Sequence, residues 1–201
     1  MDFRPSTLAG LVIAASFAAG LNVYATVLTL GFLARMHWVE LPQGLDVLAS
    51  WWVIGGSAGL FAVEFFADKI PGFDLVWNAL HTLVRIPLAA LLAYRATNQL
   101  SPEMQLLATC AGALIATAAH SSKTAARTLI TASPEPVSNI ALSTGEDAIA
   151  VGLTWTATRH PWIAGGIAAG LTLTAILTIH WIALAIAKAW KWLWQPQRST
   201  V

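Results

Sequence analysis

Residues 64–85 read EFFADKIPGFDLVWNALHTLVR, a run in which ionisable residues are set among strongly apolar ones. The ionisable side chains of this run are Glu64, Asp68, Lys69, Asp74, His81 and Arg85. On both sides of it the chain is so apolar that most of it is suited to lipid. Ionisable side chains among apolar segments must pair with each other, face the interior of a bundle or contact water, so they restrict how the segments can pack.

Composition indicates the broad class. The chain has 201 residues, of which 57% are hydrophobic and 10% charged, and its mean hydropathy is +0.65. A soluble domain is about 25% charged, so we predict an integral membrane protein. A spanning helix needs about 20 largely apolar residues, so the chain holds one compact bundle and no sizeable soluble domain. The formal net charge of +1 argues against nucleic acid as a partner.

Six hydrophobic segments follow one another, separated by polar or proline-containing breaks. They cover about residues 7–34, 47–66, 75–95, 104–119, 137–157 and 162–187, and the fourth continues through HSSKTAARTLIT, 120–131, where it becomes polar on one side. The first is too long for a signal-peptide core, so we expect it to be retained. The pattern predicts an all-α bundle of about six transmembrane helices, forming a single domain over residues 1–201.

The positions of Lys and Arg predict orientation, because short cytoplasmic loops carry the excess. With six spans, one side holds Arg4, Lys69, Lys188, Lys191 and Arg198. The other side holds Arg35, Arg95 and Arg159. This excess predicts that both termini lie in the cytoplasm.

Two pairs of segments are similar to each other. The run from Ala9, AGLVIAASFAAGLNVYATVLT, aligns with AGALIATAAHSSKTAARTLIT from Ala111, and LPQGLDVLA at 41–49 aligns with LSTGEDAIA at 142–150. A duplication with repeats 7–98 and 103–190 is one explanation, and chance similarity is the other. Because three is an odd number of spans, the two repeats would cross the membrane in opposite directions. Many secondary transporters are built from such inverted repeats, and their sites lie on discontinuous helices.

Two polar interruptions fit such discontinuous helices. Gly20 and Asn22 interrupt the first segment, and HSSK at 120–123 interrupts its aligned counterpart. Close packing between helices explains small and polar residues at these positions equally well.

Polar residues three or four positions apart recur in four segments, and such positions share one face of a helix. They are Glu64 and Asp68 at the end of the second segment, Asp74, Asn78, His81 and Arg85 in the third, His120, Lys123 and Arg127 in the fourth, and Asn139, Ser143 and then Glu146 or Asp147 in the fifth. Ionisable groups in a membrane face the bundle interior, pair with each other or line a water-filled path. Asn22 and Tyr24 are weaker candidates, because a lone polar residue often only joins two helices.

These residues suggest two roles. The candidates for binding an anionic group are Arg85, His120, Lys123, Arg127 and Asn139. The candidates for exchanging protons or cations are Glu64, Asp68, Asp74, His81, Glu146 and Asp147. The alternative is that all these charges form structural ion pairs.

The stretch SPEPVSN, residues 133–139, predicts a short extended link, because proline disfavours helical geometry in the residue before it. Ser138 or Asn139 can cap the fifth helix, whose N-terminus would attract an anion near Lys123. Glu135 is a secondary candidate in this link. A simple turn between helices explains the stretch equally well.

The stretches GLNVYATVLTLG, ADKIPGFD, HTLVR, SPEPVSN and GED resemble those of a domain-of-unknown-function family of small bacterial integral membrane proteins. The resemblance covers nearly the whole chain. It implies a multi-pass protein of the bacterial inner membrane and supplies no activity.

The favoured hypothesis is a small transporter or channel for an anionic or phosphate-bearing solute or lipid head group, coupled to protons or cations. A non-catalytic scaffold is the alternative and a lipid-head-group enzyme the second. No HExxH, GxSxG or P-loop sequence is present, so an enzyme is less favoured and no cofactor is expected. His81 and His120 with Asp74 and Glu64 could bind a divalent ion, but their spacing is not the signature of a metal site, so the sequence leaves the question of a metal open. We expect Cys110 to be a small buried packing residue. Expected partners are the bilayer, the anionic ligand and a second copy of the chain.

Overall fold

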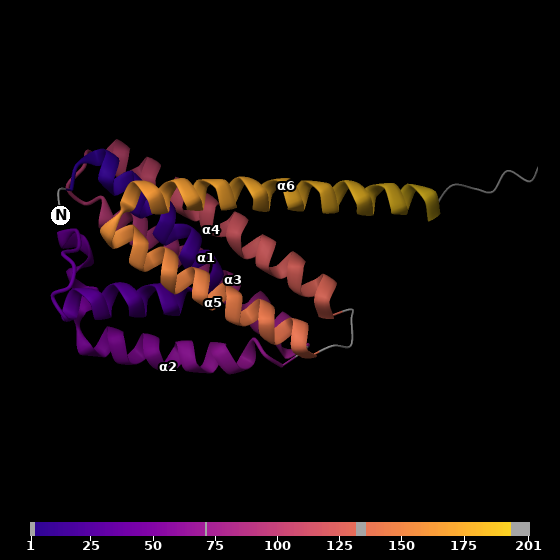
Figure 1. The fold of residues 1–201 in the computed structure, drawn as a ribbon. Helices are drawn as coiled ribbons and strands as arrows, with labels where there is room; N and C mark the ends of the chain where they lie inside the picture. Colours follow the sequence, from indigo (N-terminus) through magenta and orange to yellow (C-terminus); the bar gives the residue numbers. More distant parts are fainter. Residues whose placement is uncertain (1–2, 71, 132–135, 194–201) are drawn as a thin grey trace, which may run out of the picture.

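The chain is all-helical in the computed structural model, which describes residues 3–70, 72–131 and 136–193 (Figure 1). The elements are α1 (Pro5–Arg35), the 3-10 helix η1 (Gln43–Ala49), α2 (Trp51–Ala67), α3 (Phe73–Ala96), α4 (Pro102–Thr131), α5 (Pro136–Arg159) and α6 (Pro161–Leu193). Each predicted hydrophobic segment corresponds to one of the long helices. The predicted all-α class is therefore confirmed.

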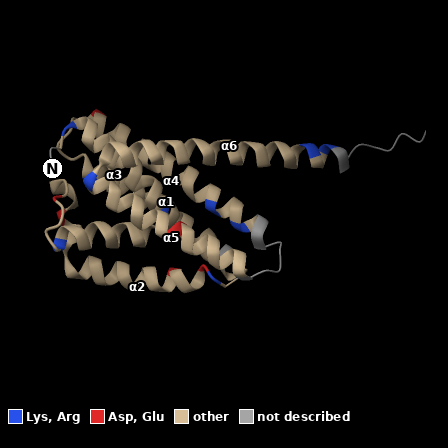
Figure 2. Cartoon of the chain, in the orientation of Figure 1, with Lys and Arg blue, Asp and Glu red and all other residues tan. Residues whose placement is uncertain are grey.

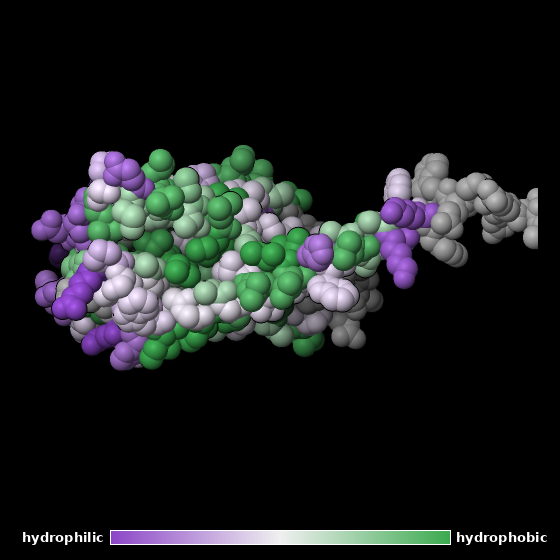
Figure 3. Space-filling view, turned by 90° about the horizontal axis from the view of Figure 1, so that it is seen from above, coloured by the Kyte–Doolittle hydropathy of each residue, from purple (hydrophilic) through white to green (hydrophobic). Residues whose placement is uncertain are grey.

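Several of these helices can cross a membrane by length and composition. Within the described residues they are Pro5–Arg35, Val76–Ala96, Pro102–Thr128 and Pro161–Lys191, and η1 with α2, bent by 68°, is a fifth if the pair counts as one span. Hydrophobic residues cover most of the face in Figure 3, and hydrophilic ones gather at the left end and near the end of α6. The structure thus shows a membrane-type bundle without confirming six spans.

α1 is not one straight helix. Asn22 has φ −150° and ψ 100°, which is extended backbone, and it divides α1 into a first arm, 5–21, and a second arm, 23–35. Leu30 of the second arm borders one small cavity together with Leu11, Val12, Ala15 and Ser16 of the first. The two arms therefore lie side by side, and α1 is a helical hairpin with its tip at Asn22.

Both arms of the hairpin reach the same end of the bundle, here called the near end. Gly10 of the first arm packs on the backbone of Pro161, and Gly31 of the second packs on the backbone of Leu48. In Figure 1 the N-terminus lies at this left-hand end, from which α2 also starts, whereas α6 ends on the right. The opposite, far end holds the α2–α3 turn and the end of α4.

The hairpin changes the charge count on which the predicted orientation depends. Because α1 returns to the near end, Arg4 shares that end with Arg35, Arg95 and Arg159 instead of lying opposite them. The positive charges are then no longer concentrated on one side. The prediction of both termini in the cytoplasm requires a first segment that spans, so it loses its basis here.

The aligned segments of the proposed repeat also differ in shape. α4 is helical without a break through 120–123, whereas α1 folds back at its own interruption. Asp46 lies in η1 at the near end, and Asp147, its aligned partner, lies in the middle of α5. The repeat is not confirmed.

Close packing between helices centres on the hairpin. A Cβ on Gly20 would lie 2.6 Å from the carbonyl oxygen of Ala116 and 2.7 Å from the Cβ of Ala119, so only glycine lets the first arm approach α4 this closely. Cys110 lies on another face of α4 and is exposed. The predicted buried packing role of Cys110 is therefore wrong, because α4 turns Ala116 and Ala119 inward instead.

Candidate functional site

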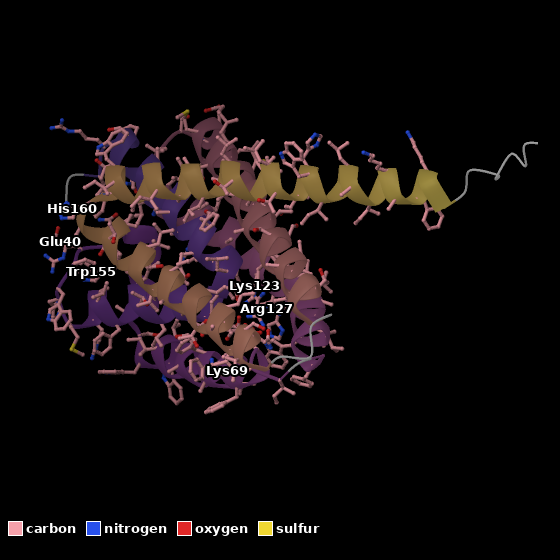
Figure 4. The ribbon with its side chains drawn as sticks, turned by 45° about the vertical axis from the view of Figure 1, so that its right-hand side comes forward. Glu40, Lys69, Lys123, Arg127, Trp155 and His160 are labelled. Carbon is pink, nitrogen blue, oxygen red and sulfur yellow. The ribbon has the colours of Figure 1, made fainter. Side chains whose placement is uncertain are left out.

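The predicted polar stripes meet in one place, toward the far end of the bundle. The charge cluster consists of Glu64 and Asp68 at the end of α2, Arg85 of α3, Lys123 and Arg127 of α4, and Glu146 and Asp147 of α5. All seven residues are buried. Acidic residues on α2 and α5 and basic residues on α4 gather there in Figure 2, and Figure 4 shows Lys123 and Arg127 beside each other, far from Glu40 and His160.

Arg85 links α2, α3 and α4. Its Nη2 pairs with Glu64 Oε1 at 2.5 Å, and its Nη1 donates to Asn78 Oδ1 at 2.7 Å and to His120 Nδ1 at 3.0 Å. A guanidinium only donates, so Nδ1 of His120 must be the acceptor. The His120 Nε2–H then faces Thr82 Oγ1 at 2.7 Å, and Thr82 donates to the carbonyl of Asn78. The geometry therefore fits a neutral His120.

Lys123 is the centre of the charge cluster. Its Nζ lies 2.8 Å from Asp68 Oδ2, 3.5 Å from Glu64 Oε1 and 3.5 Å from Glu146 Oε2. It also donates to the carbonyl oxygen of Leu21, at 2.9 Å. One ammonium thus contacts three carboxylates and the last carbonyl before the break in α1.

Arg127 holds the far side of the charge cluster. Its Nη2 pairs with Glu146 Oε2 at 2.5 Å and with Asp68 Oδ2 at 3.0 Å, and its Nη1 donates to the Asp68 carbonyl at 2.9 Å. Asn139 Nδ2 donates to the same carbonyl at 3.2 Å. The end of α2 is therefore fixed by α4 and α5 through both its backbone and its side chain.

The hairpin tip reaches this network through Asn22. Its Oδ1 accepts from the backbone N–H of Ala25 at 2.9 Å, which is the bond that an N-cap residue makes to the first turn of a helix. Its Nδ2 donates to Asp147 Oδ1 at 2.8 Å. The first arm ends at the Leu21 carbonyl, at the negative end of a helix dipole, where the Lys123 ammonium is electrostatically favourable. Both half-helix ends are thus satisfied by the charge cluster.

Asp147 differs from the other carboxylates of the charge cluster. Among the described residues it forms no ion pair, its Oδ1 accepts from Asn22, and its Oδ2 is buried without a hydrogen-bond partner. Burying an ionised carboxylate is costly when neither a cation nor a second donor compensates it.

Two predicted residues, His81 and Tyr24, lie at the edge of the charge cluster together with Lys69, which is not among the predicted site residues. The His81 ring stacks on Trp77 with centroids 4.1 Å apart and meets the edge of Tyr24 at 5.8 Å. Lys69 Nζ lies 3.1 Å from the centroid of the Phe65 ring and donates to Ser143 Oγ at 3.3 Å. Burial lowers the pKa of the Lys69 ammonium from its ordinary value.

Most of the predicted site residues are therefore brought together. Asn139 is buried on α5, but the helix already begins at Pro136, so neither Ser138 nor Asn139 is its N-cap as predicted. Glu135 lies outside the described residues, and so does the side chain of Asp74.

The residues missed by the sequence argument are Thr82 and the backbone of Leu21. A helix carbonyl such as that of Leu21 can accept a hydrogen bond from a side chain on another helix only where its own helix breaks. In the sequence, that break is indicated by the polar interruption at Gly20 and Asn22. Among the residues that the structure describes, no group of three or more His, Cys, Asp or Glu side chains is arranged to hold a metal ion.

Several of the described helices are long and apolar enough to cross a membrane, and together the helices enclose a broken hairpin and a dense charge network, which is consistent with a membrane protein. Residues 9–181 match the family described as "Domain of unknown function (DUF4126)". The chain belongs to this family, as its sequence resemblance predicts. Comparisons with curated proteins and with solved structures give no match.

Proposed function

We propose that this protein is a small proton- or cation-coupled transporter of the bacterial inner membrane, with its site at the tip of the α1 hairpin. The observation that carries the proposal is the meeting of a broken helix and a buried charge network. Non-helical backbone at membrane depth is tolerated where it is buried in protein or lines an aqueous cavity. Transporters use such broken helices to place half-helix ends at substrate and ion sites.

Asp147 is the proposed proton carrier. Its ionised form accepts a charge-assisted hydrogen bond from Asn22, and such bonds are about twice as strong as neutral ones. Protonation weakens that bond, so the proton content of Asp147 determines how firmly α5 holds the hairpin tip. The proposed site therefore has two arrangements, in which α5 holds the hairpin tip firmly or loosely. Protonation of Asp147 shifts the equilibrium between them.

The same geometry links protons to an anionic substrate. Arg85, Lys123 and Arg127 are each held by carboxylates of the charge cluster. An anion reaches these cations only when a carboxylate gains a proton or moves aside. We therefore propose that an anionic or phosphate-bearing solute binds together with a proton, in place of a carboxylate contact.

A scaffold is the second candidate, and one observation favours it. Each cation of the charge cluster already has a carboxylate partner, which is also what a purely structural network needs. In that case the ion pairs only lock α2, α3, α4 and α5 together, and no proton exchange accompanies any solute.

The test is proton flux in liposomes that contain the purified protein and a pH-sensitive dye. An imposed pH gradient is combined with gradients of Na⁺, K⁺, phosphate or a short-chain carboxylate. Asp147→Asn keeps the size of the side chain and its contact with Asn22, and Asp46→Asn, at an exposed position of η1, is the matched control. We expect one solute to drive proton movement in the parent and in Asp46→Asn and not in Asp147→Asn. Flux that persists in Asp147→Asn would contradict the proton role, and no solute-driven flux in the parent would favour the scaffold.

A further inference from the structure

An apolar groove of about 530 Å³ opens on the side of the bundle, apart from the charge cluster. Ligand pockets usually have volumes of about 300–1,000 Å³ and mainly apolar linings with a few polar groups. The groove is formed by the second arm of α1, η1, α2 and α3, and its mainly apolar lining includes Tyr24, Trp52, Gly56, Leu60, Tyr94 and Arg95. Its lining is thus suited to a hydrocarbon chain.

The rim of the groove lies at the near end and is aromatic and basic. Trp52 is 92% exposed and Tyr94 is 46% exposed. Trp and Tyr concentrate where a membrane protein meets the lipid head groups. The rim therefore lies at head-group level, while the groove extends from it toward the bilayer interior.

Arg95 is the charged group of this rim. Its Nε donates to the Gly44 carbonyl at 3.0 Å, which fixes the guanidinium beside the groove. Within the described part of the chain its two Nη groups have no partner, and Asp46 on the neighbouring η1 makes no ion pair with it. Two free, oriented N–H groups suit a phosphate, which a guanidinium can bind with two parallel hydrogen bonds.

The groove has a definite depth. From Trp52 to Leu60 α2 advances eight residues, or about 12 Å at 1.5 Å per residue. The inner limit is Tyr24, which is buried and lies two residues beyond the hairpin tip. Gly56 borders the groove on α2, and a Cβ there would meet nothing within 4 Å.

We propose that this groove binds one acyl chain of an anionic phospholipid, with the phosphate on Arg95. The charge of the rim selects the head group, and the apolar walls accept the chain. Basic sites between membrane helices recognise acidic lipids in this way. The inference depends on the groove alone and stands whether or not the protein transports a solute.

The experiment is native mass spectrometry of the detergent-purified protein with phosphatidylglycerol or phosphatidylcholine carrying the same chains. Gly56→Leu adds a side chain to the wall of the groove at a position where a Cβ meets nothing within 4 Å, and Gly55→Leu is its control, because a Cβ on Gly55 also has open space but Gly55 does not border the groove. Arg95→Gln removes the head-group contact, and Arg159→Gln removes another near-end charge. Thermal unfolding verifies that each variant is folded.

We expect the parent to bind phosphatidylglycerol about five-fold more tightly than phosphatidylcholine, the preference expected from one basic contact. Arg95→Gln should bind the two lipids equally, Gly56→Leu should lose both, and both controls should behave like the parent. Equal binding of the two lipids by the parent, or unchanged binding in folded Gly56→Leu, would overturn the proposal. A Gly56→Leu variant that binds lipid normally but no longer dimerises would also overturn the proposal, because the groove would then be an interface between two copies.

Discussion

α1 and α4 are both long, largely apolar helices with a polar interruption, and they align with each other in sequence, yet only α1 breaks. At the break, the side chain of Asn22 caps the second arm. In α4 the aligned residue, Thr124, donates to the His120 carbonyl of its own helix and leaves the backbone continuous. One helix thus contributes backbone groups to the site and the other contributes charged side chains, and the two meet where Lys123 contacts Leu21.

The strongest way to break this relationship is Lys123→Met. The substitution leaves Glu64, Asp68 and Glu146 without their shared cation and the Leu21 carbonyl without its donor. Removing one partner of a buried ion pair costs about 3–5 kcal/mol. We expect a loss of that size in the free energy of unfolding, measured by thermal and denaturant unfolding in detergent. Lys188→Met, on an exposed part of α6, should change it by less than about 0.5 kcal/mol.

A smaller loss in the free energy of unfolding is expected from Asn22→Ala. It removes the cap of the second arm, which is worth about 0.5–2 kcal/mol, and leaves Asp147 Oδ1 without a donor. Asn22→Ser should retain most of the cap and recover part of the stability. Thr124→Ala, at the aligned position of α4, is the matched control and should be nearly neutral. Equal losses for Asn22→Ala and Thr124→Ala would contradict the distinction between the two helices.

The approach of the two helices can be tested at Gly20. A Cβ there would lie well inside contact distance of Ala116 and Ala119, and overpacking costs about 1–3 kcal/mol. Gly20→Ala should therefore lower the unfolding temperature and slow any solute flux. The result that would contradict this packing is a Gly20→Ala protein as stable as the parent.

The smallest effect is expected from Gly59→Ala on α2, where the added methyl group meets nothing within 4 Å. Replacing glycine in an open helical position stabilises a protein by about 0.4–1 kcal/mol, mainly by restricting the unfolded chain. The unfolding temperature should rise slightly. A fall would show that α2 packs against something at this position.

The sequence predicts much of this fold, because hydrophobic length and proline-containing breaks locate each long helix. It also predicts most of the site, since residues three and four apart on α2, α3, α4 and α5 must share a face. It could not predict that α1 turns back. Asn22 is compatible with both a packing contact and a cap, and only the position of Lys123 and Asp147 in space distinguishes them. The predicted orientation lost its basis for the same reason.

The hairpin is the central claim, and cysteine accessibility tests it most directly. In a Cys110→Ser background, single cysteines are introduced by Ser6→Cys, Glu40→Cys and Ile70→Cys, all at exposed positions. Each is then reacted with a membrane-impermeant thiol reagent from one side of sealed membrane vesicles. The hairpin predicts that Ser6→Cys and Glu40→Cys react from the same side and Ile70→Cys from the other. Labelling of Ser6→Cys and Glu40→Cys from opposite sides would show that residues 7–34 cross the membrane, and would contradict the hairpin.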